Sequence, residues 1–216
     1  TIYIMRNSVV TFPLPANEPV KTYLKGSPER EAIEKELERQ SNTVVEIPLI
    51  IGGKEVRTGK MGKVVCPHDH NHVLANYHMV GEQEVQMAID AAMEAHKQWA
   101  DTDWTVRAAI TLKMAELLAT KYRPIINAAC MLGQSKNFYQ AEIDSACETI
   151  DFFRYNVHYA SKIYSMQPKD APGCIDHMEF RPLEGFVLAV TPFNFTSIAS
   201  NLCMTPVLMG NVAIWK

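Results

Sequence analysis

The sequence of 216 residues lacks the features that mark several classes of protein. It has no apolar run approaching the roughly 18 residues of a transmembrane helix, so we expect no membrane partner. Its 21 basic and 24 acidic residues leave a net charge of −3, which does not favour a nucleic-acid-binding surface. Collagen-like and low-complexity stretches are also missing, and a hydrophobic content of 47% is typical of a globular protein.

Cysteine is scarce and dispersed. The five cysteines are Cys66, Cys130, Cys147, Cys174 and Cys203. Their odd number and the lack of a C-x-x-C pair favour reduced thiols in an intracellular protein. No signal peptide is visible. The chain starts at Thr1 rather than at a methionine and stops just after an expected strand at residues 212–215, so we expect it to be part of a longer polypeptide.

Turn signals and apolar periodicity divide the chain into four expected regions. These are an N-terminal arm with a surface helix (1–43), antiparallel strands (44–80), a helical layer (81–169) and the incomplete start of a Rossmann-like unit (170–216). Ser27 and Pro28 predict the N-terminus of a helix that runs to about Gln40. Gly52-Gly53 is typical of a hairpin turn. Exposed edges of such short strands often pair with a partner chain.

The helical layer shows apolar residues at every third or fourth position, which predicts four helices. The last of them begins near Phe138 and runs for about 25 residues. The pattern then changes, because the apolar run at residues 186–190 predicts a strand buried on both faces. A helix-like segment follows and ends at Gly210, before the last strand. A strand, a helix and a strand of these lengths predict a parallel, right-handed βαβ unit, and hence an α/β fold.

Polar residues follow both strands of this unit. Ligands of open parallel sheets bind at the carboxyl ends of the strands, where residues 191–196 and Lys216 lie. Lys216 comes 25 positions after Thr191, near the place where dinucleotide-binding units carry their ribose-binding residue. A lysine there can donate to ribose oxygens and would tolerate a 2′-phosphate. Because G-x-G-x-x-G is missing, a solvated Lys216 and an Asn194 that caps the next helix remain the alternative.

Three segments of this unit resemble the aldehyde dehydrogenase superfamily. They are Thr191-Pro-Phe-Asn-Phe-Thr196, Pro206-Val-Leu-Met-Gly-Asn211 and Ile214-Trp-Lys216. Further segments are similar to the Δ1-pyrroline-5-carboxylate (glutamate-γ-semialdehyde) dehydrogenase family within it. They are Asn17-Glu-Pro-Val20, Gly26-Ser-Pro-Glu-Arg30, Gln140-Ala-Glu-Ile-Asp144, Ile150-Asp-Phe-Phe-Arg154 and Leu183-Glu-Gly-Phe186. The resemblance covers nearly the whole chain and is to the N-terminal part of the family's enzymes.

The resemblance implies a role for each matched residue. Asn194 corresponds to the amide that stabilises the oxyanion when a cysteine attacks the aldehyde, a contribution of about 3–4 kcal/mol to the barrier. The residues that correspond to NAD contacts are Thr191, Pro192, Phe193 and Lys216. Phe195 corresponds to an aromatic wall of the aldehyde pocket and Glu148 to an acidic residue of that pocket. A solvated helix glutamate is an equally good interpretation of Glu148.

The resemblance also implies a reaction, in which L-glutamate γ-semialdehyde is oxidised to glutamate with NAD during proline catabolism. The family's nucleophilic cysteine and general-base glutamate lie in later motifs that do not occur here, so the chain alone is expected to be inactive. Cys203 in particular is interpreted as a small buried side chain. The family forms homodimers or higher homo-oligomers and occurs in the mitochondrial matrix or the bacterial cytoplasm.

Two other hypotheses remain open. In one, the chain is a truncated, non-catalytic homologue that acts as a binding or assembly module. In the other, it is a nucleotide-binding module outside the superfamily. A longer gene product with a downstream cysteine motif would favour the enzyme. His68, His70 and His72 alternate along one segment and allow a metal site, although solvated loop histidines are favoured and no metal is expected. Asn194-Phe195-Thr196 fits the glycosylation pattern, which a cofactor-lining turn makes a poor interpretation.

Overall fold

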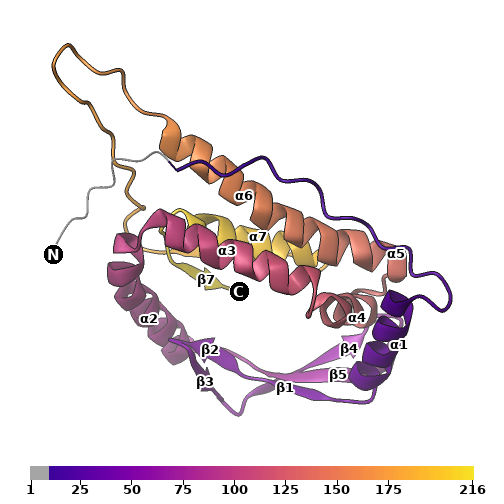
Figure 1. Ribbon diagram of the computed structural model, residues 1–216. Coiled ribbons are helices and arrows are strands. Elements are labelled where there is room, and N and C mark those ends of the chain that lie inside the picture. Colours follow the sequence, from indigo (N-terminus) through magenta and orange to yellow (C-terminus); the bar gives the residue numbers. More distant parts are fainter. Residues whose placement is uncertain (1–9) are drawn as a thin grey trace.

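The computed structural model describes residues 10–216, so the start of the irregular arm expected at residues 1–26 lies outside the described residues. Residues 10–26, here called the strap, contain no helix or strand. The strap runs along the outside of the long helical segment at residues 138–165 and leads into the first helix (Figure 1). As the strap advances from Phe12 to Lys21, its contacts move back from Ser161 to Glu142, so the two segments are antiparallel.

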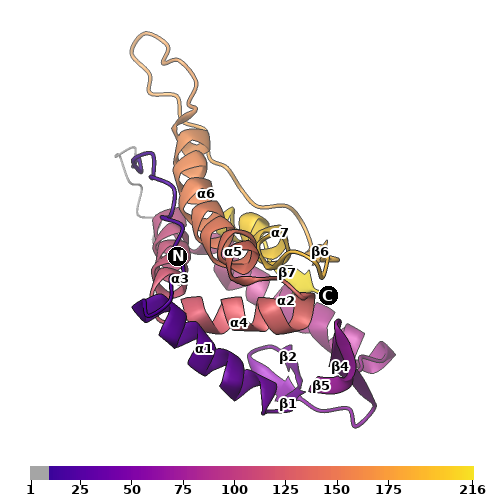
Figure 2. The same ribbon diagram turned by 90° about the vertical axis from the view of Figure 1, so that its right-hand side faces the viewer.

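The elements follow in the order α1 (Pro28–Ser41), β1 (Val45–Ile47), β2 (Leu49–Ile51), β3 (Lys54–Val56), β4 (Met61–Cys66), β5 (Asp69–His78), α2 (Glu82–Asp101), α3 (Trp104–Ala119), α4 (Arg123–Gln134), α5 (Phe138–Ala141), the π-helical turn η1 (Glu142–Cys147), α6 (Glu148–Ser165), β6 (Val187–Ala189), α7 (Thr196–Leu208) and β7 (Ala213–Trp215). The loop between α6 and β6 projects beyond the end of α6 in both views (Figures 1 and 2). The helix expected at Ser27 is confirmed, because the Ser27 side chain accepts from the backbone N–H of Arg30.

The strands of the first half form two small sheets. β2 and β3 pair antiparallel around Gly52-Gly53, which confirms the predicted hairpin. β4 and β5 also pair antiparallel. The expectation of antiparallel strands throughout this region is wrong for β1, which pairs parallel with β5 in a sheet of order β1-β5-β4. β1 and β5 are parallel neighbours, although the hairpin β2–β3 and strand β4 separate them in the sequence.

Three helices, α3, α6 and α7, lie side by side and enclose the main apolar core (Figure 1). Ala108 of α3, Val157 of α6 and Leu208 of α7 meet in one buried cluster. A second cluster joins α3 to Ile150 and Phe153. α1 packs against α4 on the other side of the molecule. Within residues 10–216, none of the helices combines the length and apolarity needed to cross a bilayer.

The long helix predicted from Phe138 is helical throughout but not uniform. It consists of α5, the π-helical turn η1 and α6, so its hydrogen-bonding pattern changes over six residues. Such π turns are rare and occur frequently at functional sites. The apolar periodicity did not reveal it, because one wide turn only shifts the phase of the pattern.

The C-terminal unit is the expected βαβ arrangement. β6 and β7 pair parallel, and α7 between them ends before Gly210, whose φ of +94° suits glycine. Within the described residues, only one face of the first strand, β6, is buried. Ala189 is buried, but Leu188 and Val190 are each 59% exposed. Since neighbouring side chains of a strand point to opposite faces, one face of β6 is covered and the other is open.

Candidate active site

The ends of β6 and β7 meet at the start of the segment 191–196, here called the site turn. The backbone N–H and the hydroxyl of Thr191 both donate to the carbonyl oxygen of Lys216, at 3.0 and 3.1 Å. The indole N–H of Trp215 donates to the hydroxyl of Thr191 at 3.2 Å. The sequence prediction that Thr191 and Lys216 lie together is therefore confirmed.

The middle of the site turn is open to solvent. Phe193 is 89% exposed, and Asn194 is exposed as well. The alternative in which Asn194 caps the following helix is wrong, because the N-cap of α7 is Phe195, whose side chain makes no capping hydrogen bond. The Asn194 amide is thus not used to satisfy the helix, and its side chain is exposed.

A lysine that the sequence did not single out lies under the site turn. The ammonium of Lys136 donates to the carbonyl oxygen of Asn194 at 2.6 Å and pairs with Asp144 Oδ2 at 2.8 Å. It also lies 4.0 Å from the centroid of the Phe195 ring, in a cation–π contact. Lys136 follows α4 and Asp144 belongs to η1, so the turn is held by two elements far from it in sequence.

The start of α7 is held by further polar contacts. Ser197 carries no exposed surface, and its hydroxyl donates to Glu148 Oε2 at 2.7 Å. Gln134 Nε2 donates to the hydroxyl of Thr196 at 3.3 Å. Glu148 is half-buried, and its negative charge lies at the positive end of the α7 dipole. Glu148 is therefore partly solvated and is also bonded to Ser197.

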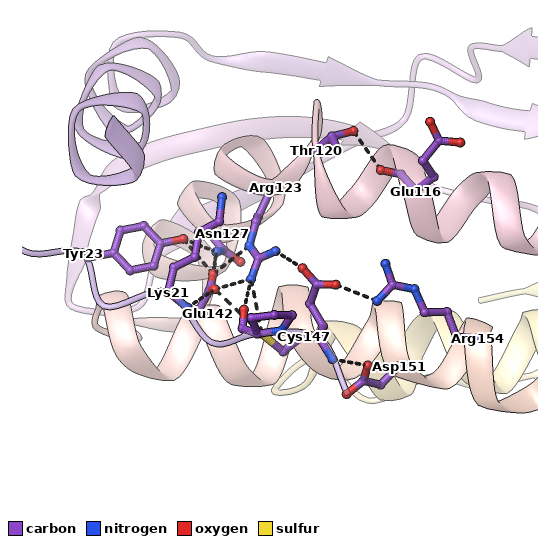
Figure 3. A network of polar contacts seen from close by, with 12 residues as sticks. Lys21, Tyr23, Glu116, Thr120, Arg123, Asn127, Glu142, Cys147, Asp151 and Arg154 are labelled. Carbon is purple, nitrogen blue, oxygen red and sulfur yellow. Dashed lines mark hydrogen bonds and ion pairs between the residues drawn. The ribbon is translucent and has the colours of Figure 1, made fainter. Parts of the chain in front are cut away.

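The buried network shown in Figure 3 fixes the opposite side of η1. Glu142 carries no exposed surface. It pairs with Arg123 and accepts from Lys21 N (2.8 Å), Tyr23 Oη (2.7 Å) and Asn127 Nδ2 (2.9 Å). Burial alone would raise the pKa of this carboxyl, but the hydrogen bonds and the positive charge outweigh it and hold the pKa below its ordinary value of 4.5. Burial and the bond to Glu142 raise the pKa of Tyr23 well above its ordinary value.

Arg123 extends the same network to the strap. Its guanidinium pairs with Glu18 and donates to the carbonyl oxygen of Pro19 at 2.8 Å. Glu18 also pairs with Arg154 at 2.6 Å, and its backbone N–H donates to Asp151 Oδ1 at 2.8 Å. The strap, α4 and α6 are therefore joined around η1, and Glu142 fixes the turn from which Asp144 reaches the site.

Three buried cysteines, Cys130, Cys147 and Cys203, do not have the properties of a nucleophile. Burial raises the pKa of Cys203 to about 11, and burial together with the charge of Glu142 raises the pKa of Cys147 to about 12. Burial also raises the pKa of Cys130, which donates to Gln134 Oε1 at 3.1 Å. These three side chains are thiols near neutral pH, and it is the thiolate that attacks carbonyl groups.

The other two candidate sites are the histidine segment at residues 68–72 and a surface cavity beside α1. Among residues 10–216, no three His, Cys, Asp or Glu side chains converge in an arrangement that could hold a metal ion. His72 instead contacts the backbone oxygen of Ser41, at 2.7 Å. A cavity of about 210 Å³ between the strap and α1 is lined by Tyr23 and Arg123, whose polar groups belong to the buried network.

Comparison with known proteins agrees with this arrangement. The profile of the aldehyde dehydrogenase family matches residues 55–216, and the chain belongs to that family. The fold class and the family inferred from the sequence are thus confirmed.

Individual relatives show to which enzymes of the family the chain is similar. The chain is 49% identical over 212 residues to Delta-1-pyrroline-5-carboxylate dehydrogenase of Agaricus bisporus. The alignment covers 96% of this chain and 39% of the relative. It is 43% identical to the mitochondrial Delta-1-pyrroline-5-carboxylate dehydrogenase of Homo sapiens, over 93% of this chain and 36% of that protein. The chain therefore spans less than two fifths of the length of these relatives.

A solved structure shows the same fold. It is the Delta-pyrroline-5-carboxylate dehydrogenase from Mycobacterium tuberculosis bound with NAD, with a TM-score of 0.94 and 45% identity. The alignment covers 97% of this chain and 39% of that one.

The sequence pattern identified the site turn through its strand–turn–helix motif. It gave no signal for Lys136, Asp144 or Ser197, because their partners lie 49 to 58 positions away or are reached only through η1.

Proposed function

We propose that the protein carrying this chain oxidises L-glutamate γ-semialdehyde, the open form of Δ1-pyrroline-5-carboxylate, to glutamate with NAD, in proline catabolism. The observation that carries the proposal is the likeness, at 45% identity and a TM-score of 0.94, to a Delta-pyrroline-5-carboxylate dehydrogenase bound with NAD. The curated relatives of similar identity bear the same enzyme name.

Asn194 is the residue of this chain that we assign to the chemistry of the aldehyde. Its amide N–H donates to the carbonyl oxygen as negative charge develops there, and the amide keeps this donor at any pH. The exposure of Asn194 and its freedom from helix capping support this role. Phe195 and Glu148 line the aldehyde pocket in this proposal, and the bond from Ser197 holds the Glu148 carboxylate in place.

NAD supplies the acceptor of the hydride. The residues we assign to its binding are Thr191, Pro192, Phe193 and Lys216. They fit the cofactor because the carboxyl ends of two parallel strands meet there and Lys216 is exposed. The Lys216 ammonium donates to ribose hydroxyls. It also accommodates a 2′-phosphate, so NADP is the competing cofactor.

The remaining catalytic groups are assigned to parts of the protein outside this chain. The raised pKa values of Cys130, Cys147 and Cys203 do not suit an attacking thiolate. The chain contributes the oxyanion donor and part of the cofactor site, and it is inactive by itself. The four regions given by the sequence fit this division, with residues 170–216 as the start of the cofactor-binding unit.

The protein acts as a homodimer or a higher homo-oligomer in this proposal. β1 and β4 are the edges of their sheet, and Val45 and Ile47 of β1 are exposed, which suits pairing with a second copy. Several eukaryotic relatives are named mitochondrial. We therefore place a eukaryotic form in the mitochondrial matrix and a bacterial form in the cytoplasm.

The test is NADH formation from Δ1-pyrroline-5-carboxylate by the product of the intact gene, with NADP and with residues 1–216 alone as comparisons. We expect turnover with the intact product and NAD, and none with residues 1–216. Failure of the intact product to reduce either cofactor would reject the proposal. That result, together with an intact product no longer than this chain, would favour the second candidate, a non-catalytic binding or assembly module.

A further inference from the structure

Lys136 lies on a short backbone segment that is fixed at both ends. Ser135 before it ends α4 in the left-handed region, with φ +56° and ψ +34°. Asn137 after it is the N-cap of α5, where its side chain accepts from the N–H of Gln140 while the Gln140 side chain accepts from the N–H of Asn137. The Lys136 side chain therefore starts from a defined point, and it is only 14% exposed.

The ammonium of Lys136 contacts three partners at once. It forms an ion pair with Asp144 at 2.8 Å and donates to the carbonyl oxygen of Asn194 at 2.6 Å. It also lies 4.0 Å from the centroid of the Phe195 ring. Both polar contacts are charge-assisted and therefore stronger than neutral hydrogen bonds. Asp144 is itself placed by η1, whose first residue, Glu142, is buried in the network with Arg123.

The site turn has little else to define its middle. Thr191 is bonded to Lys216 at one end, and Thr196 accepts from Gln134 at the other. Phe195, the N-cap of α7, makes no capping hydrogen bond with its side chain. The carbonyl of Asn194 belongs to the peptide that joins it to Phe195, so a bond to this oxygen fixes the direction in which the Asn194 side chain leaves the backbone.

We infer that Lys136 is a positioning residue of the proposed active site. Held by Asp144, its ammonium fixes the carbonyl of Asn194 and the ring of Phe195, and so orients the Asn194 amide toward the aldehyde oxygen. This inference rests on the proposed function. Lys136 acts through Asn194 and not on the substrate, because its ammonium is already engaged by three partners.

The experiment is a double-mutant cycle in the product of the intact gene, with Lys136→Met, Asn194→Ala and the combined variant. We expect Lys136→Met to lower kcat by about 10- to 100-fold with little change in the KM for NAD, since small displacements of a catalytic group cost rates of this order. In the Asn194→Ala background the same substitution should lower kcat by less than about 3-fold, because residues that act as a unit are not additive. Lys113→Met, which removes an exposed ion pair with Glu116 on α3, is the matched control.

An equal loss of kcat in both backgrounds would overturn the inference, because Lys136 would then act independently of Asn194. An unchanged kcat in Lys136→Met would overturn it as well. If Lys136→Met does not fold, Asp144→Asn replaces it in the same cycle, with a smaller loss expected and the same criterion of non-additivity.

A second measurement separates this inference from the proposed function. Hydrogen exchange of the backbone amides of residues 193–196 should be at least about 10-fold faster in Lys136→Met than in Lys113→Met, because a local contact is lost. An inactive wild-type enzyme would reject the proposed function. Unchanged exchange in an active enzyme would reject the positioning role of Lys136 alone.

Discussion

The two faces of the π-helical turn η1 carry polar clusters of opposite character. On one face Glu142, which is fully buried, belongs to a network that joins the strap to α4 and α6. On the other face Asp144 holds Lys136 beneath a turn whose Phe193 and Asn194 side chains are exposed. The buried cluster contributes mainly to stability, because breaking it leaves charges without partners. The partly exposed cluster is the one to which we assign the positioning of Asn194.

The strongest way to test this contrast is to break the buried network. Arg123→Met removes the guanidinium, which leaves Glu142 without its ion-pair partner and Glu18 with Arg154 alone. The free energy of unfolding should fall by about 3–5 kcal/mol, as for other buried ion pairs that lose one member. Denaturant or thermal unfolding of the intact gene product measures the change.

The matched control is Arg181→Met, because Arg181 is 81% exposed and pairs with Glu184. Exposed pairs contribute less than about 1 kcal/mol, so this variant should be close to wild type. Equal effects of the two substitutions would show that the network at η1 contributes no more than a surface pair.

A smaller effect is expected from a single hydroxyl of the same network. Tyr23→Phe removes the donor that lies 2.7 Å from Glu142 and leaves the ring in its buried position. A hydrogen bond to a charged group contributes about 1.5–3 kcal/mol, and the unfolding free energy should fall by this amount. Tyr139→Phe alters an exposed tyrosine and should leave stability unchanged. A neutral Tyr23→Phe would contradict the account of Glu142 as a carboxylate that depends on its donors.

The smallest effect is expected in the pH dependence of the unfolding free energy, which tests the role of Glu142 in the buried network. The pKa of Glu142 is lower in the folded protein than its ordinary 4.5, so its ionisation stabilises the fold above about pH 4.5. This contribution decreases as the pH falls below 4.5 toward the folded pKa. Unfolding free energies measured across this range should fall more steeply in the wild type than in Glu142→Gln. The difference between the slopes isolates Glu142 from other carboxylates, and identical slopes would contradict the assignment.

Local signals in the sequence predicted much of the fold. Ser27-Pro28 marks the start of α1, Gly52-Gly53 the β2–β3 hairpin and Gly210 the end of α7. Each depends on the conformational preference of a few neighbouring residues. The parallel pairing of β1 with β5 and the π turn could not be predicted in this way, since both depend on packing between distant parts of the chain.

The residues of the candidate site also fall into those that the sequence identified and those that it did not. Thr191, Asn194 and Lys216 were identified because they lie at strand ends and within a motif. Lys136 was missed because its bond to Asn194 spans 58 positions and no spacing in the sequence relates the two.

The most direct test of the central claim is the turnover number of Asn194→Ala in the product of the intact gene, with glutamate γ-semialdehyde and NAD. The account predicts a fall in kcat of about 10²- to 10³-fold, as for other oxyanion donors, with thermal stability close to wild type because Asn194 is exposed. Asn71→Ala, an exposed asparagine on β5, should retain full activity. Near-normal turnover in Asn194→Ala would contradict the assignment of the site turn to the chemistry of the aldehyde.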